Sequence, residues 1–167
     1  MSGKTDSARL SFGEKVGYGL GDMASNFYMG FFGLFLLYYY TDVFGISPAA
    51  AATMLLITKV VDAISDPAMG LIADRTSTRW GRYRPYLLWI AVPYALLGYL
   101  LFLGPEFSDT GKLVYAYVTY TLVMLAYTAI NVPYSALLAV ISPVSEERTK
   151  ATQFRFVFAS LGTLCVG

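Results

Sequence analysis

The sequence contains no histidine and a single cysteine, and only 14% of its residues are charged. One cysteine cannot form a disulfide within the chain. Without histidine the commonest general base and metal ligand is missing, so we expect that the protein is not an enzyme and has no metal site and no cofactor. A net charge of +1 provides no basic face for nucleic acid. Soluble domains cover themselves with more charge, which favours a membrane protein.

Long apolar blocks separated by short polar segments fill most of the chain, and 56% of its residues are hydrophobic. A membrane crossing with its loop takes roughly 25 to 30 residues, so we predict an all-α membrane protein with about five helices. The polar start lacks the apolar core of a signal peptide, so we interpret residues 1–15 as a cytoplasmic tail. The predicted helices lie near residues 16–41, 49–73, 85–103, 113–140 and 151–167.

Basic residues are concentrated in alternate polar segments, which indicates how the chain is oriented. Short cytoplasmic loops retain lysine and arginine, so the segments that contain most of them are expected on the cytoplasmic side. We therefore predict a multi-pass protein of the plasma (inner) membrane with a cytoplasmic amino terminus. The residues that carry this prediction are Lys4, Arg9, Lys15, Arg75, Arg79, Arg82, Arg84, Arg148 and Lys150.

Three ionisable residues, Lys59, Asp62 and Asp66, lie inside the second predicted helix. Their offsets of three and four place them on one stripe of a helix. A charge at membrane depth is costly unless it is paired or faces water, so such a stripe indicates a functional lining. Two carboxylates against one ammonium leave an excess negative charge that an arriving cation could neutralise. The alternative is an internal salt bridge that only locks two helices together.

Polar and aromatic residues form faces on two other predicted helices. Tyrosine rings can stack on a sugar ring, and hydroxyl, carboxylate and amide groups can bind its hydroxyls, so these faces predict a sugar site. By contrast, we interpret Tyr38, Tyr39 and Tyr40, at a helix end, mainly as interfacial residues. The face residues are Tyr18, Asp22 and Asn26 on the first helix and Tyr120, Tyr127, Asn131 and Tyr134 on the fourth.

Four ordered motifs add to this interpretation: YYYTD at 38–42, DAISDP at 62–67, TRWGR at 78–82 followed by Arg84 and Pro85, and NVPY at 131–134. Together they resemble the glycoside-pentoside-hexuronide:cation symporter family of the major facilitator superfamily. The resemblance spans nearly the whole chain. It implies the major facilitator fold, with this chain as about five helices of the amino-terminal six-helix half.

The resemblance also implies roles for individual residues. Coupling-cation binding is expected at Asp62 and Asp66, with Ser65 in place of an asparagine of that motif. Sugar binding is expected at Asn26, Tyr127, Thr128, Asn131 and Arg155, with Asp22 on the same face as Asn26. The polar loop resembles the cytoplasmic signature loop of major facilitators, whose charges favour one facing state; its matching residues are Asp74, Arg75, Gly81 and Arg82.

The expected function is secondary active transport of a sugar or glycoside, coupled to Na+ or H+, by alternating access. Asn26 and Asn131 replace aspartates of the melibiose-carrying members, and Arg155 could pair with a carboxylate, so a glucuronide and a pentoside both fit. The implied partners are the substrate, the lipid bilayer and a missing carboxyl-terminal half. A membrane sensor or assembly partner on the same scaffold, without transport activity, is the alternative.

Overall fold

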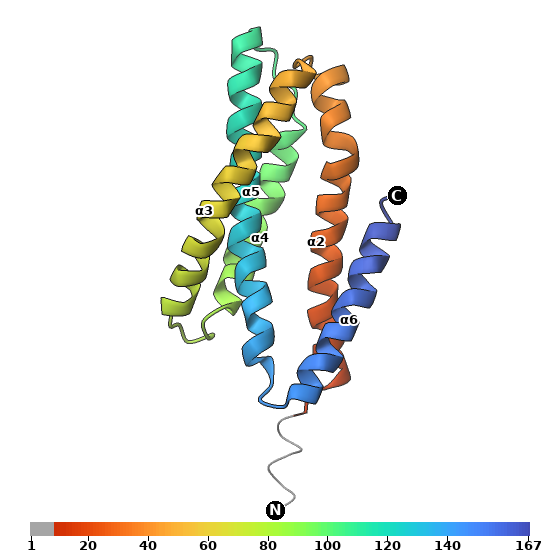
Figure 1. The fold of residues 1–167 in the computed structure, drawn as a ribbon, viewed down its shortest axis with the longest axis vertical. Coiled ribbons are helices and arrows are strands. Elements are labelled where there is room, and N and C mark those ends of the chain that lie inside the picture. The colour runs from red at the N-terminus through yellow and green to blue at the C-terminus, as the bar shows by residue number, and fades with distance from the viewer. Residues whose placement is uncertain (1–8) are drawn as a thin grey trace, which may run out of the picture. The chain divides into compact units, whose positions relative to one another are not determined.

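The computed structural model describes residues 9–167, which form five α-helices and one π-helical turn. This confirms the predicted all-α fold. The elements labelled in Figure 1, with the short π-helix η1, are α2 (Phe12–Tyr38), η1 (Tyr39–Val43), α3 (Pro48–Arg75), α4 (Arg84–Leu101), α5 (Asp109–Ile141) and α6 (Ser145–Leu164). They belong to two compact units: a terminal unit, made of the described residues up to Leu36 with Ala136–Gly167, and a central unit, Leu37–Ser135.

The first helix begins at Phe12, earlier than the predicted residue 16, because Ser11 and Glu14 form a capping box. The Ser11 amide donates to Glu14 Oε2 at 2.8 Å, and the Glu14 amide donates to Ser11 Oγ at 3.2 Å. These reciprocal bonds satisfy amide groups that a helix start leaves without partners. The predicted tail over 1–15 is therefore helical from Phe12, and its residues 1–8 lie outside the described part of the chain.

The last helix also begins earlier than predicted, at Ser145 instead of residue 151. Glu146 and Glu147 lie in its first turn, where the partial positive charge of the free amides favours acidic side chains. Thr149 adds a bond from its hydroxyl to the Ser145 carbonyl, 3.1 Å long. Hydrophobicity alone predicts a helix from residue 151 and leaves these polar residues outside it.

Side-chain hydroxyls join the helices of the central unit to one another. Tyr117 on α5 donates to the carbonyl of Ala50 on α3 at 2.9 Å, and Tyr39 donates to the carbonyl of Phe102, just after α4, at 2.9 Å. The second bond satisfies a carbonyl that the end of a helix leaves free. The helices enclose a core whose fully buried side chains include Tyr40, Met54, Leu101 and Val123.

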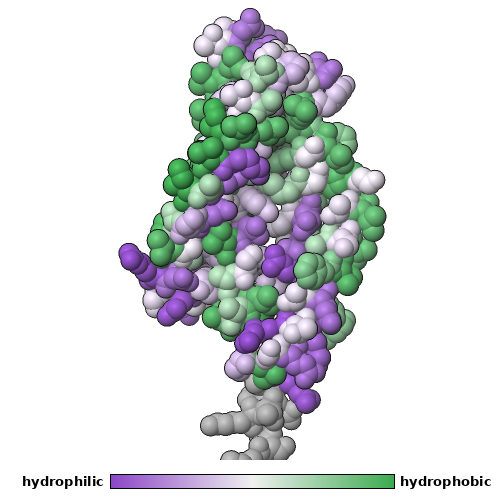
Figure 2. Space-filling view, in the orientation of Figure 1, coloured by the Kyte–Doolittle hydropathy of each residue, from purple (hydrophilic) through white to green (hydrophobic). Residues whose placement is uncertain are grey.

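In the described part of the chain, four helical segments are long and apolar enough to cross a membrane, namely Phe12–Val43, α3, α4 and α5. The fifth helix, α6, is not among them, because four of its first six residues are charged. Figure 2 shows apolar side chains, in green, over much of the visible surface. Exposed large apolar residues such as Leu56, Trp89 and Phe156 suit a surface that faces lipid. The chain is thus a multi-pass membrane protein.

Candidate functional site

Asp62 on α3 combines partial burial with an unsatisfied oxygen. Its side chain is 16% exposed, and its Oδ2 lies 3.7 Å from the ammonium of Lys59, whose side chain is 75% exposed. Its Oδ1 is buried and accepts no hydrogen bond from any residue within the described range. An ammonium as exposed as Lys59 stabilises a carboxylate only weakly. Lys59 therefore offsets little of a negative charge on Asp62.

Asp66, one turn further along α3, is bound by α5. The Thr128 hydroxyl donates to Asp66 Oδ1 at 2.8 Å, and Thr128 is buried while Asp66 is exposed. Between the two aspartates, Ser65 Oγ donates to the Asp62 carbonyl at 3.4 Å. Thr128 was predicted as a sugar-binding residue, but the structure places its hydroxyl against a predicted cation ligand. We call Asp62, Ser65, Asp66 and Thr128 the carboxylate cluster.

Tyr127 and Asn131 on α5 are bound to each other. Nδ2 of Asn131 donates to the Tyr127 hydroxyl at 3.1 Å, and the Tyr127 ring lies 6.4 Å from the ring of Tyr94 on α4. Both residues are partly exposed, whereas Tyr120 and Tyr134 on the same helix are buried, with 7% and 5% exposed. Of the predicted α5 face, Tyr127 and Asn131 are therefore the residues that can reach a ligand.

In the terminal unit, Asp22 on α2 and Arg155 on α6 form an ion pair. Nε of Arg155 lies 3.1 Å from Oδ2 of Asp22, and the two side chains are 25% and 10% exposed. The Tyr18 hydroxyl lies close enough to interact with both charges. One turn along α2, Nδ2 of Asn26 donates to the Asp22 carbonyl at 2.8 Å. The structure thus brings together Asp22, Asn26 and Arg155, which were all predicted to bind sugar.

Two glycines allow α2 and α6 to approach closely enough for this ion pair. A Cβ on Gly162 would lie 2.6 Å from the Met23 carbonyl oxygen, and one on Gly19 would lie 2.5 Å from the ring of Phe158. Either distance is shorter than carbon atoms tolerate, so a larger residue would push the helices apart. Figure 1 shows the two helices side by side. A larger residue thus meets backbone at Gly162 and the Phe158 ring at Gly19.

The predicted gating loop is held by local contacts within the central unit. The Tyr83 hydroxyl donates to Asp74 Oδ1 at 2.7 Å, and the Thr78 hydroxyl donates to the Gly81 carbonyl at 2.7 Å. Gly81 has a φ of 96°, which side chains other than glycine rarely adopt. The arginines expected to act with Asp74 and Gly81, Arg75 and Arg82, are exposed.

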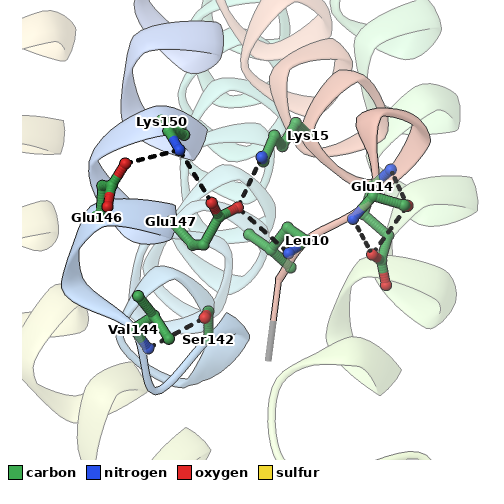
Figure 3. A network of polar contacts seen from close by, with 9 residues as sticks. Leu10, Glu14, Lys15, Ser142, Val144, Glu146, Glu147 and Lys150 are labelled. Atoms are coloured by element: carbon green, nitrogen blue, oxygen red, sulfur yellow. Dashed lines mark hydrogen bonds and ion pairs between the residues drawn. The ribbon is translucent and has the colours of Figure 1, made fainter. Parts of the chain in front are cut away.

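A charged network at the start of α2 and α6 was not predicted. Figure 3 shows the Glu147 carboxylate between two ammonium groups: Lys15 lies 2.6 Å from Oε2, and Lys150 lies 3.2 Å from Oε1. The Leu10 amide also donates to Oε2, at 3.3 Å. The capping box at Ser11 was a sequence signal that α2 starts early enough to include Lys15, but nothing in the sequence paired Lys15 with Glu147.

The predicted site residues therefore form groups in both units. The carboxylate cluster and the Tyr127–Asn131 pair belong to the central unit, and the Asp22–Arg155 pair belongs to the terminal unit. Within residues 9–167, no three histidine, cysteine, aspartate or glutamate side chains gather as a metal site. A cation at the carboxylate cluster would need oxygen ligands from neutral groups as well.

The sequence matches one protein family and several relatives. The family described as MFS/sugar transport protein matches residues 17–167. The inner membrane symporter YicJ of Escherichia coli is 45% identical over 92% of this chain and 33% of its own length. The glucuronide carrier protein homolog of Escherichia coli is 41% identical over 95% of this chain and 35% of its length. The isoprimeverose transporter of Lactiplantibacillus pentosus is 38% identical over 94% and 33%. The chain spans about a third of the length of these relatives.

Proposed function

The chain belongs to the MFS/sugar transport protein family, and on that premise we propose that it forms the amino-terminal part of a carrier that moves a sugar or glycoside together with a cation. The names of its relatives describe symporters, carriers and transporters, which supports transport over catalysis. Because the chain spans about a third of their length, the carrier needs further helices. In alternating access, this chain and the further helices would rock against each other around a substrate bound between them.

The carboxylate cluster is the observation that carries this proposal. Asp62 holds a buried oxygen without a hydrogen-bond donor among the described residues, and its ion pair with Lys59 is long and exposed. A charged carboxylate in this setting is destabilised when no cation is bound, so binding of Na+ or a proton is favoured. Oxygen atoms of Ser65 and Thr128 lie beside the aspartates and suit a hard cation such as Na+.

We propose sugar-binding groups in each unit by itself, on α5 in the central unit and on α2 and α6 in the terminal unit. Tyr127 provides an aromatic ring, and Asn131 provides an amide beside it for a sugar hydroxyl. Asn26 and Arg155 provide further hydrogen-bonding groups, and Asp22 lies next to both. The central unit thus offers a stacking ring with an amide, and the terminal unit offers hydrogen-bonding groups, both of which are kinds of group that sugar sites use.

The proposed orientation of the chain in the membrane is based on the distribution of its basic residues. We place the Lys15–Glu147 network and the loop after α3 on the cytoplasmic side of the inner membrane, because basic residues gather there. The loop contacts of Asp74 and Gly81 would then lie at the cytoplasmic ends of α3 and α4. Charged loops in this position can stabilise one facing state of a carrier.

Transport by membrane vesicles tests the proposal. Vesicles that contain the full-length carrier are given labelled neutral and acidic glycosides, with an inward Na+ gradient, an inward pH gradient or no gradient. Accumulation above the external concentration with a gradient, and equilibration without one, is the expected result. The matched control carries Asp62→Asn together with Asp66→Asn. Failure of the unaltered carrier to accumulate any glycoside under either gradient would refute transport and favour a sensor or assembly role.

A further inference from the structure

We infer that a cavity between the starts of α2 and α6 binds the phosphate group of an anionic phospholipid. The cavity has a volume of about 440 Å³, and none of the residues proposed for sugar or cation lines it. Its charged lining comes from the terminal unit and consists of Arg9, Lys15, Glu146, Glu147 and Lys150. Figure 3 shows Glu147 between the two lysines, with Glu146 beside Lys150. The inference does not depend on the proposed transport activity.

The cavity lies where a membrane-spanning segment begins. Phe12–Val43 is long and apolar enough to cross a membrane, and Arg9 and Leu10 come just before it. Lipid phosphates lie just outside the hydrocarbon core, at the depth where such a segment starts. Basic side chains that gather at this depth favour anionic headgroups. The position of the cavity therefore suits a phosphate that belongs to the membrane.

The inner charges of the cavity are committed to one another. The Glu147 side chain is 6% exposed, and its Oε2 lies 2.6 Å from the ammonium of Lys15, which is 14% exposed. The same oxygen accepts from the Leu10 amide at 3.3 Å. Removing one member of a buried pair is strongly unfavourable, so a ligand does not displace these groups. They form the floor of the cavity.

The outer charges of the cavity are the ones that a ligand can reach. Arg9 is exposed, and the Lys150 side chain is 44% exposed. Both can donate charge-assisted hydrogen bonds to a phosphate. Their competitor is Glu146, which lies 2.8 Å from the Lys150 ammonium and also interacts with Arg9. Because the Glu146 side chain is 76% exposed, its pairing is weak, and a phosphate can replace it.

Apolar side chains beside the charges distinguish a lipid from a free phosphate compound. Phe12 is 73% exposed and packs edge-on against Phe154, with the ring centroids 5.7 Å apart. Phe12 lies three residues from Lys15, and Phe154 lies four residues from Lys150. Side chains at these spacings share one face of a helix, so the rings lie on the side of the charges. An acyl chain can cover the rings while its phosphate reaches the cavity.

Binding of dioctanoyl phosphatidylglycerol to the purified full-length protein, measured as a Kd by native mass spectrometry, tests the inference. Arg9→Gln and Lys150→Gln should each weaken binding about fivefold, the effect of one basic residue near an anionic headgroup. Glu146→Gln should tighten binding about twofold to fivefold, because the weak competitor for Lys150 is removed. Arg84→Gln is the matched control, since it removes an exposed arginine from the central unit, and it should leave the Kd unchanged.

Two further probes identify the part of the lipid that binds. Glycerol 3-phosphate lacks the acyl chains and dioctanoylglycerol lacks the phosphate, and both should bind more weakly than the phospholipid. Equal binding of glycerol 3-phosphate would make the ligand a free phosphate compound, and equal binding of dioctanoylglycerol would make it an uncharged lipid; either result would overturn the inference. So would equal Kd values in Arg9→Gln, Glu146→Gln and Arg84→Gln. Arg9 and Glu146 are exposed, so these two variants decide the test even if Lys150→Gln does not fold.

Discussion

The ammonium nitrogen of Lys15 lies 2.6 Å from a carboxylate oxygen of Glu147, which joins the first turn of α2 to the first turn of α6. Both side chains are largely buried, with 14% and 6% exposed. The hydrogen bond from Lys15, supported by Lys150, lowers the pKa of Glu147 from 4.5 to about 2. A carboxylate whose pKa is lowered by folding stabilises the protein above its unfolded pKa and loses that contribution as it becomes protonated.

The first prediction concerns stability against pH. The Glu147 contribution should be fully present above pH 4.5 and should disappear as the pH falls toward 2. Glu147→Gln should lower the unfolding temperature at pH 7 and weaken its dependence on pH below 4.5, as measured by thermal unfolding in detergent. Glu106→Gln, at an exposed glutamate, is the matched control and should match the unaltered protein. An unchanged pH profile in Glu147→Gln would show that the network adds no stability.

The second prediction concerns topology. A reporter fused after Lys150 should be active as a cytoplasmic protein, and one inserted near Ser108, between α4 and α5, should be external. Basic residues before α2, after α3 and at the start of α6 give the physical reason. Paired reporters that are active on opposite sides of the membrane provide the measurement. The reverse pattern would exclude a cytoplasmic amino terminus.

The third prediction concerns coupling. Asp62→Asn or Asp66→Asn keeps the size of the side chain and removes one charge from the carboxylate cluster. Each variant should insert and bind sugar weakly, but should lose the gain in sugar affinity that Na+ or H+ provides, because coupling between two sites is reciprocal. Sugar binding titrated with and without the cation measures this gain. Full cation-dependent accumulation in both variants would make the aspartates structural partners of Lys59 and Thr128.

The fourth prediction concerns the sugar. Asn131→Ala removes an amide that bonds the Tyr127 hydroxyl and can bond a sugar hydroxyl. The apparent substrate constant should rise about fivefold to tenfold, the effect of losing one hydrogen bond. Tyr127→Phe is the matched variant, since it removes the shared hydroxyl but keeps the ring, and its effect should be smaller. Normal affinity of Asn131→Ala for every tested glycoside would remove Asn131 from the site.

The fifth prediction concerns the packing of α2 against α6. Gly162→Ala should lower stability by about 1–3 kcal/mol, as expected for overpacking, because its Cβ would lie 2.6 Å from the Met23 carbonyl oxygen. Gly33→Ala is the control in α2, where a Cβ meets nothing within 4 Å, and it should raise stability by about 0.5–1 kcal/mol. Thermal unfolding of both variants provides the measurement. Equal stability of the two would contradict the close approach of these helices.

Much of the secondary structure of this protein could be predicted from its sequence. Long apolar runs with few charges require helices in a membrane, because no other open structure satisfies backbone hydrogen bonds in lipid. Local spacing also placed Asp62 and Asp66 on one side of α3, because a helix fixes the angle between residues four apart. The helix starts at Phe12 and Ser145 were missed, although Ser11 and Glu14 form a capping box that is visible in the sequence.

Contacts between distant segments could not be predicted in this way, since they depend on how helices pack. Tyr38, Tyr39 and Tyr40 show this in three consecutive residues. Tyr38 is 61% exposed, as an interfacial residue would be, whereas Tyr39 donates to the Phe102 carbonyl and Tyr40 is 1% exposed in the core. Residues of one type in one motif thus have three different surroundings.

The sequence by itself determined the class of protein, the helices and the charges they contain, because these follow from local composition and helical periodicity. Only the tertiary structure decided which charge each group meets. It placed Asp22 on Arg155, Thr128 on Asp66 and Glu147 on Lys15. The electrostatic energy of two charges depends on their distance in space, which their separation along the chain does not determine. The partner of each buried charge therefore depends on the packing of the helices.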